Sequence, residues 1–247
     1  MIATIVHNGK NVNVDFSKPI DISLAVKIGG VKAWYVTEPC FVPVRLGDWV
    51  GEVKQGGSVN FRDIIFNPHG HGTHTECVGH ISKEDYSIND CLKQFMFIAK
   101  LITVIPEKIN DDLVITKNSL LNLLNEENSE ALIIRTSSDL PEKLSKNYSN
   151  TNPAYIHEDA IKCIIQKGFN HLLFDTPSVD KEDDKGQLLA HRAFWEYPDN
   201  IQKFRTITEL VYIPDLIIDG EYFLNLQVAA FENDAAPSRP VLYEFLS

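Results

Sequence analysis

Four of the chain's eight histidines fall within fifteen residues, in the segment NPHGHGTHTECVGHI (67–81). His74 and Glu76 are two positions apart, so in an extended strand they project from the same face, with about 6.6 Å between their Cα atoms. The alternating β-branched threonines favour that strand. An imidazole and a carboxylate at this spacing can converge on one metal ion. A helix would place them about 200° apart, so this is not the HExxH arrangement of helical zinc sites.

Two histidines precede this strand and are candidates for a third ligand. His69 and His71 lie on a segment that Gly70 and Gly72 make flexible, so either side chain can fold back. Cys77 occupies the opposite face of the strand, and we expect it to be a small buried side chain. Imidazole and carboxylate ligands without thiolate are typical of catalytic zinc or manganese sites.

The composition indicates a globular protein that binds neither nucleic acid nor membranes. The 247 residues are 44% hydrophobic, which is enough for a substantial core. Against 34 acidic residues there are 23 basic ones, so a net charge of −11 offers nothing to phosphate backbones or anionic lipids. With no apolar run of bilayer length and no signal-peptide pattern, we expect a cytoplasmic protein. The four cysteines are scattered, which favours reduced thiols.

The hydrophobic pattern predicts one α/β domain over residues 1–247, with more strand than helix. Helical spacing predicts helices within 113–128, capped by Asn118 or Ser119, and within 154–168, ended by Gly168. A strand, the second helix and another strand then follow one another, which predicts a parallel strand pair. Strands are expected within 2–9, 11–17, 34–39, 93–106, 131–137, 171–180, 206–216, 220–231 and 240–245.

The stretch GTHTECVGH resembles the signature of the cyclase family of metal-dependent hydrolases, approximately HxGTHxDxPxH. Glu76 stands where the family has aspartate, and Val78 where it has proline. The family's first histidine falls on Gly70, so we take His69 as its counterpart, in a loop one residue longer, and His71 as the alternative. The residues that match in register are Gly72, Thr73, His74 and His80.

Later segments extend the resemblance over most of the chain from about residue 65 onward. FDTPSVD (174–180) resembles the family's DTxSID segment, and DAAPSRPV (234–241) resembles its final hairpin. His191, in LLAHRAFW, resembles the family's second metal-site histidine. Glu209, which precedes a leucine in TELVYIPDL, resembles its last ligand. Residues 27–50 do not match the family, so the resemblance leaves substrate selection open.

The resemblance implies a metal site and a fold. Zinc is the expected metal and manganese the alternative, as one ion or as two ions bridged by Glu76. The implied α/β fold has a strand-rich mixed sheet packed with helices, of the swivelling β/β/α type, and forms a homodimer or a higher homo-oligomer. The implied ligands are His69, His74 and Glu76, with His191 and Glu209 from later strands.

The predicted function is hydrolysis of an amide-type C–N bond in a small molecule, such as an N-formyl or N-acyl arylamine or a cyclic amide. The metal activates water, and His80 acts as general base and acid. One alternative is a protein of the same fold that holds a metal and a ligand without turnover. Another is a cysteine hydrolase based on Cys77, which the position of Cys77 on the opposite strand face argues against.

Other residues have two interpretations each. Asp175 and Asp180 flank a TPSV turn, so we expect them to stabilise the turn, with support of a histidine ring as the alternative. Arg135 lies in an apolar run and requires either a buried carboxylate partner or an anionic substrate. Four aromatic residues of the N-terminal section either wall the substrate pocket or pack in the core: Trp34, Tyr35, Phe41 and Trp49.

Overall fold

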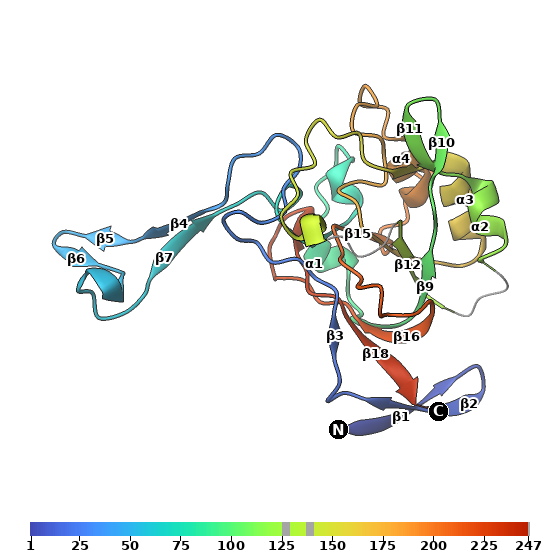
Figure 1. The fold of residues 1–247 in the computed structure, drawn as a ribbon, viewed down its shortest axis with the longest axis horizontal. Helices are drawn as coiled ribbons and strands as arrows, with labels where there is room; N and C mark the ends of the chain where they lie inside the picture. Colours follow the sequence, from blue (N-terminus) through green and yellow to red (C-terminus); the bar gives the residue numbers. More distant parts are fainter. Residues whose placement is uncertain (125–128, 137–140, 247) are drawn as a thin grey trace.

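One large mixed β-sheet crosses the body of the molecule (Figure 1). The computed structural model describes residues 1–124, 129–136 and 141–246. Eleven strands form this sheet: β1 (Ile2–His7), β2 (Lys10–Asp15), β3 (Ile20–Asp21), β8 (His74–Glu76), β9 (Met96–Thr103), β12 (Ala131–Arg135), β14 (His171–Phe174), β15 (Thr206–Glu209), β16 (Gly220–Asn225), β17 (Ala235–Pro237) and β18 (Val241–Leu246). Their order is β1-β2-β18-β16-β9-β12-β14-β15-β8-β17, with β3 paired to β18.

The middle of the sheet is parallel and its flanks are antiparallel. β12 pairs in parallel with β9 and β14, and β14 pairs in parallel with β15. β8 then pairs antiparallel with both β15 and β17. The connection from β12 to β14 contains the helix α3 (Glu158–Gln166), so the predicted strand-helix-strand unit is confirmed. The strand-rich mixed α/β fold is confirmed as well.

Hydrophobic clusters cover both faces of the central strands. Leu132 and Ile134 of β12 pack in a cluster with three helices, whereas Ala131 and Ile133 pack in a cluster on the opposite face. Burial on both faces explains why this strand has an uninterrupted apolar sequence. The helices of the described residues all fall short of the length and hydropathy that a bilayer span requires. They are α1 (Ile88–Cys91), α2 (Lys117–Leu121), α3 and α4 (Leu189–Trp195), with 3₁₀ turns η1 (Val53–Gln55), η2 (Val78–His80) and η3 (Pro141–Leu144).

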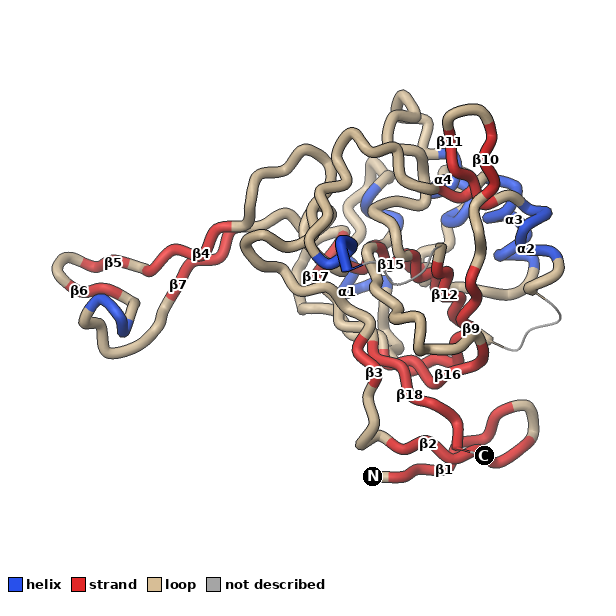
Figure 2. Tube along the Cα trace, in the orientation of Figure 1, coloured by secondary structure: helices blue, strands red, loops and turns tan. Residues whose placement is uncertain are grey.

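A long two-stranded ribbon projects from the body (Figures 1 and 2). It consists of the antiparallel pair β4 (Cys40–Pro43) and β7 (Arg62–Ile65), continued by β5 (Arg45–Leu46) and β6 (Trp49–Val50). We call residues 40–65 the arm. A separate small sheet contains β10 (Glu107–Ile109), β11 (Asp112–Ile115) and β13 (Tyr155–Ile156).

Two of the predicted elements differ in the structure. Residues 34–39, predicted as a strand, are irregular, because Trp34 and Tyr35 have φ values of 57° and 60° that no extended strand allows. The first predicted helix is short, since α2 begins after Thr116, whose hydroxyl accepts the N–H of Ser119 at 3.2 Å. Thr116 is therefore the N-cap that was assigned to Asn118 or Ser119. The predicted end of that helix, 125–128, lies outside the described residues.

Arg135 has the carboxylate partner that one of the two interpretations required. Its Nη2 donates to Asp219 Oδ1 at 3.0 Å, and its Nε donates to Thr103 Oγ1 at 2.9 Å. Its Nη1 donates to the carbonyls of Pro214 and Ile217, each at 2.9 Å. These bonds tie the end of β12 to the loop that precedes β16.

The buried His171 makes the fold sensitive to acid. Its ring packs on Phe97 with 4.1 Å between centroids, and its Nδ1 lies 2.9 Å from Thr206 Oγ1. Burial lowers the pKa of His171 to about 4. An unfolded histidine titrates near 6.5, so between about pH 6.5 and 4 the unfolded state binds more protons than the folded state. Stability therefore falls as the pH drops through that window.

We predict that His171→Asn, which cannot titrate, loses less stability than the wild type when the pH falls from 7 to 4. The difference in the change of unfolding free energy should reach up to about 3 kcal/mol. Urea unfolding at a series of pH values measures it. An identical acid dependence in the two proteins would contradict the prediction.

Candidate metal centre

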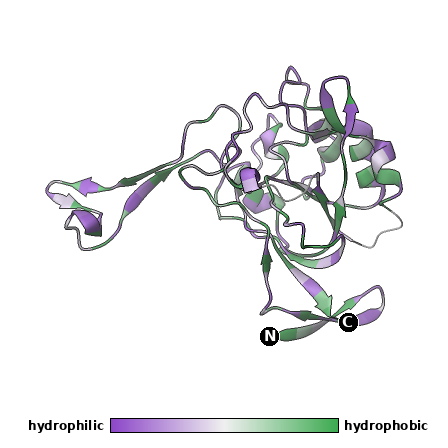
Figure 3. Ribbon diagram, in the orientation of Figure 1, coloured by the Kyte–Doolittle hydropathy of each residue, from purple (hydrophilic) through white to green (hydrophobic). Residues whose placement is uncertain are grey.

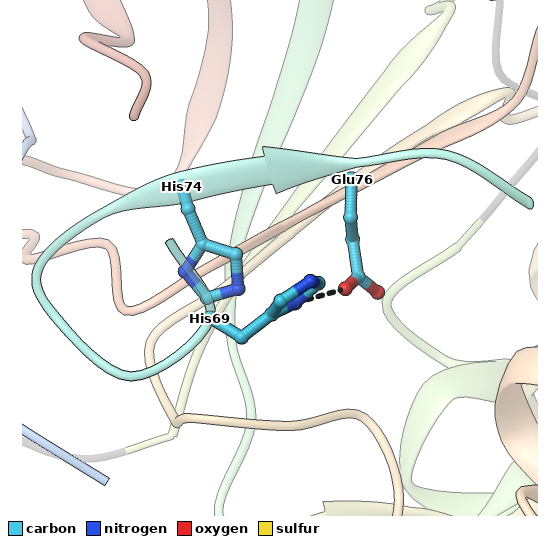
Figure 4. Close-up of side chains that lie close together, drawn as sticks. All are labelled: His69, His74 and Glu76. Carbon is cyan, nitrogen blue, oxygen red and sulfur yellow. Dashed lines mark ion pairs between the residues drawn. The ribbon is translucent and has the colours of Figure 1, made fainter. Parts of the chain in front are cut away.

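His74 and Glu76 lie on β8 and point to the same side of the strand (Figure 4). The antiparallel register with β15 sets His74 opposite Glu209 and Thr75 opposite Thr208. Because side chains alternate, the two threonine hydroxyls meet on the other side, with their oxygens 2.7 Å apart. On the inner side, His74 Nε2 lies 3.4 Å from Glu209 Oε2. Strand pairing thus brings Glu209 to the first cluster.

The loop before β8 gives His69 and His71 different positions. His69 folds back beside the strand, with its Nδ1 3.1 Å from Glu76 Oε2 (Figure 4). The Nε2 of His71 lies 2.7 Å from the carbonyl oxygen of Thr37, and its Nδ1 accepts the N–H of Asn67 at 2.9 Å. The structure therefore places His69 in the cluster, while both nitrogens of His71 hold the loop in shape.

His191 lies on helix α4, so the expectation that it comes from a strand is wrong. Asp180 fixes both the helix and the ring. Its carboxylate accepts the N–H groups of Ala190 and His191 at 2.8 and 3.1 Å, at the helix N-terminus where anions are favoured. Its Oδ2 also lies 2.5 Å from His191 Nδ1. The ring therefore directs Nε2 to Glu76 Oε1, 3.0 Å away.

Three imidazole nitrogens and two carboxylates are linked by N–O distances of 3.0 to 3.9 Å. One ligand atom from each of His69, His74 and Glu76 lies within 4.8 Å of the other two. Among the described residues, His74 Nε2 and Glu76 Oε2 are buried without a hydrogen-bond partner. Such atoms are rare because their desolvation is uncompensated, and coordination of a cation would satisfy both. The donor set therefore fits a divalent metal. The inward-facing groups are His69 Nδ1, His74 Nε2, His191 Nε2, Glu76 and Glu209.

Each of the three rings also has an acceptor next to its outer nitrogen. In metal sites, such acceptors set the ring orientation and leave the inner nitrogen unprotonated for the metal. The pairs are His69 Nε2 with Asp234 Oδ2 at 2.8 Å, His191 Nδ1 with Asp180 Oδ2 at 2.5 Å, and His74 Nδ1 with the Gly72 carbonyl at 3.3 Å.

The cluster attracts positive charge. Complete burial would by itself raise the pKa of Glu76, but the charge of His80 and contacts with two further imidazoles hold that pKa well below its ordinary value. Burial would lower the pKa of His69, yet Asp234 and Glu76 raise it to about 10. Imidazolium protons thus balance the buried carboxylates, and a divalent cation would take over that role when it displaces them.

His80 reaches the cluster through a turn that the sequence did not predict. β8 ends at Glu76, and the 3₁₀ turn η2 (Val78–His80) brings His80 back toward the cluster. Its ring centroid lies 4.2 Å from that of His69 and 5.4 Å from that of His191. Its Nδ1 is 3.4 Å from Asp234 Oδ2 and 3.9 Å from Glu76 Oε2.

A cavity of about 300 Å³ opens onto the cluster. Of the aromatic residues predicted as pocket walls, Trp34 lines it, whereas Phe41 and Trp49 belong to the arm. Tyr35 donates its hydroxyl to Glu182, another residue of the lining, at 3.0 Å. Cluster residues and apolar side chains both contribute to the lining: His69, His80, His191 and Glu209, with Trp34, Val36 and Leu188.

Three further acidic or thiol side chains have defined partners in the structure. Cys77 is buried and donates its thiol to the carbonyl of Tyr86 at 3.4 Å, away from the cluster, as its position in the strand predicted. Asp175 accepts hydrogen bonds from Thr136 and Lys143. Asp234 was missed, because it meets His69 across 165 positions of sequence and no local pattern indicates that contact.

Residues 20–181, more than half of the chain, match the Cyclase family. The chain belongs to the Cyclase family. Kynurenine formamidase from Bacillus cereus is 28% identical to this cyclase-family chain over 230 residues, which covers 93% of the chain and 96% of the relative.

Solved structures share the fold of this cyclase-family chain. A potential metal-dependent hydrolase with cyclase activity gives a TM-score of 0.68 at 17% identity, and the match covers 93% of this chain and 99% of that one. An isatin hydrolase bound to the product analogue thioisatinate gives 0.67 at 12% identity, with 93% of each chain covered. The fold class predicted from the resemblance is therefore confirmed.

The geometry predicts different effects for two neighbouring histidines. His69→Ala should weaken zinc binding by at least about 100-fold, because an inward-facing nitrogen is lost, and this loss should exceed that caused by an outer partner. The matched control His71→Ala should keep wild-type zinc affinity, although its loop should be less stable. Competition with a chromogenic chelator measures the affinity. Greater zinc loss in His71→Ala would reverse the assignment.

Proposed function

We propose that this protein is a metal-dependent hydrolase of amide-type C–N bonds in N-formyl or N-acyl arylamines or in cyclic amides. The observation that carries this proposal is a cluster of three imidazole nitrogens and two carboxylates in mutual contact beside a cavity. The similarity to proteins named kynurenine formamidase and isatin hydrolase supports the same reaction class.

The inward-facing groups would hold the metal. We expect zinc, with manganese as the alternative, because imidazole and carboxylate donors without thiolate suit both ions in catalytic sites. A bound ion of this kind supplies Lewis acidity, which polarises a carbonyl group and activates water. Glu76 lies between the ring nitrogens of His69 and His191, so its carboxylate would bridge the ions if two are bound.

His80 would transfer the proton that the reaction requires. It lines the cavity, its side chain is 30% exposed, and its ring lies next to those of two proposed ligands. As general base it accepts a proton from the attacking water. As general acid it returns that proton to the departing nitrogen.

The cavity fits a small, partly apolar substrate. Its volume is at the lower end of the range for ligand pockets, about 300–1,000 Å³. Trp34, Val36 and Leu188 give it an apolar wall, which suits an aryl ring, while the histidines form a polar side. A substrate bound in this way would direct its C–N bond toward His80.

We predict that His80→Ala keeps its zinc and loses turnover by about 10²- to 10⁴-fold, the usual contribution of a general acid-base residue. His74→Ala should instead lose zinc. Zinc content and hydrolysis of a panel of N-formyl arylamines and cyclic amides, with zinc or manganese added, should be measured on the same preparations.

Two outcomes would contradict this assignment. Equal zinc loss in the two variants would show that His80 is a ligand. If the metal-loaded wild type hydrolyses no member of the panel but shows ligand-induced thermal shifts, the protein is the alternative, a metal-holding binding protein.

We further propose that copies of this chain assemble through the arm, as a homodimer or a higher homo-oligomer. The arm carries exposed apolar residues: Val42 on β4, Phe61 just before β7 and Ile64 on β7 are 46%, 55% and 55% exposed. In Figure 3 the ribbon of the arm carries both hydrophobic and hydrophilic segments. Isolated two-stranded ribbons are marginally stable in water, so a partner surface would stabilise this one.

A second copy is the partner that the charges favour. The chain as a whole carries a net charge of −11, which opposes self-association elsewhere on its surface. The arm is neutral, with three basic and three acidic residues, so two copies can meet there without net repulsion. These residues are Arg45, Lys54 and Arg62, with Asp48, Glu52 and Asp63.

The double variant Phe61→Asp/Ile64→Asp should be monomeric, because it places charge on the proposed contact. Light scattering coupled to size exclusion should give a dimeric or larger mass for the wild type. Ile105→Asp, at an 82% exposed position outside the arm, is the matched control and should keep the wild-type mass. A monomeric wild type, or an unchanged mass in the arm variant, would overturn the proposal.

A further inference from the structure

We propose that Asp234 is a positioning residue that holds a metal ligand and the acid-base histidine together. One carboxylate oxygen serves both rings: Oδ2 lies 2.8 Å from His69 Nε2 and 3.4 Å from His80 Nδ1. The inference rests on the proposed function, because it assigns His69 to the metal and His80 to the substrate.

The two rings are arranged so that one acceptor can reach both. Their centroids lie 4.2 Å apart and their planes are inclined by 31°, so the rings are nearly stacked. His69 is 20% exposed and His80 is 30% exposed, so solvent reaches part of both rings. Without a fixed partner, each ring could adopt other orientations. A shared carboxylate removes that freedom.

The backbone holds Asp234 firmly in place. Asp234 immediately precedes β17, which pairs with β8, and its carbonyl accepts the N–H of Cys77 at 3.0 Å. The 3₁₀ turn η2 packs tightly against Asp234. A Cβ on Gly79 of that turn would lie 3.1 Å from the Asp234 Cβ and 2.2 Å from the Tyr86 carbonyl oxygen. The carboxylate is thus positioned by the same strand pairing that positions Glu76.

The charge of Asp234 favours a proton on the ring nitrogen that faces it in both histidines. With Asp234 accepting from Nε2 of His69, the Nδ1 side of the ring faces Glu76, and this nitrogen would bind a metal that displaces its proton. Asp234 Oδ2 lies 3.4 Å from Nδ1 of His80, so its charge would favour a proton on Nδ1 and leave Nε2 as the basic nitrogen for the substrate. Asp180 makes the corresponding contact with one ring, that of the proposed ligand His191. Asp234 differs because it contacts both a proposed metal ligand, His69, and the proposed general base, His80.

The first test measures zinc affinity, which does not depend on turnover. Asp234→Asn keeps the shape of the side chain but loses its charge, and Asp234→Ala removes the acceptor. Both should weaken zinc binding, by about 10- to 100-fold in the alanine variant, as is typical of outer partners of histidine ligands. The matched control Glu232→Gln removes a neighbouring carboxylate that contacts Asn89 instead of a histidine, and should bind zinc normally.

The second test uses turnover at saturating zinc. Asp234→Ala should lower kcat with little change in KM, because the substrate's apolar contacts remain. In the His80→Ala background the same substitution should cause no further loss of kcat, since the ring on which it acts is absent. A merely structural role would lower kcat by the same factor in both backgrounds.

Three results would overturn the proposal. They are wild-type zinc affinity in both Asp234 variants, equal kcat losses in the two backgrounds, and loss of one whole zinc equivalent with the remainder bound normally, which is the behaviour of a ligand. A wild type that hydrolyses no amide would refute the proposed function only. Weakened zinc binding in the Asp234 variants would then still support the contact with His69.

Discussion

The structure depends on one electrostatic constraint, the complete burial of Glu76 among histidines. A carboxylate at this depth is stable only when positive charge lies within a few ångströms. His69 Nδ1 and His191 Nε2 lie 3.1 and 3.0 Å from its two oxygens, and His80 Nδ1 lies 3.9 Å from one of them. Because the carboxylates draw cationic charge to this point, the same arrangement favours a divalent metal. The cavity opens onto this cluster, and the outer acceptors orient its rings. The proposed chemistry depends on both.

Three separate devices bring the inward-facing groups together. Strand alternation on β8 aligns His74 with Glu76, and antiparallel pairing with β15 adds Glu209. A helix N-terminus carries His191, with Asp180 bonded to both the backbone and the ring. A loop returns His69. A strand pair, a helix and a loop therefore each supply part of the cluster, and the strand pair belongs to the large sheet.

The loop before β8 is held in shape by its own side chains. His71 Nε2 lies 2.7 Å from the carbonyl oxygen of Thr37, and its Nδ1 accepts the N–H of Asn67, which stabilises the loop. Gly72 then turns with φ of 70°, where a Cβ would lie only 2.6 Å from the carbonyl of Leu24. This loop conformation places His69 beside Glu76 in the cluster.

The sequence by itself determined the features that depend on local periodicity. Period-two alternation placed His74 and Glu76 on one face and Cys77 on the other, and the apolar runs located the central strands. The motif resemblance, not the pattern, indicated His191 and Glu209. Only the tertiary structure decided that His191 is helical, that a 3₁₀ turn returns His80 to the cluster, and that Asp234 meets both rings. Those features arise from contacts between distant segments, and such contacts leave no periodic trace in the sequence.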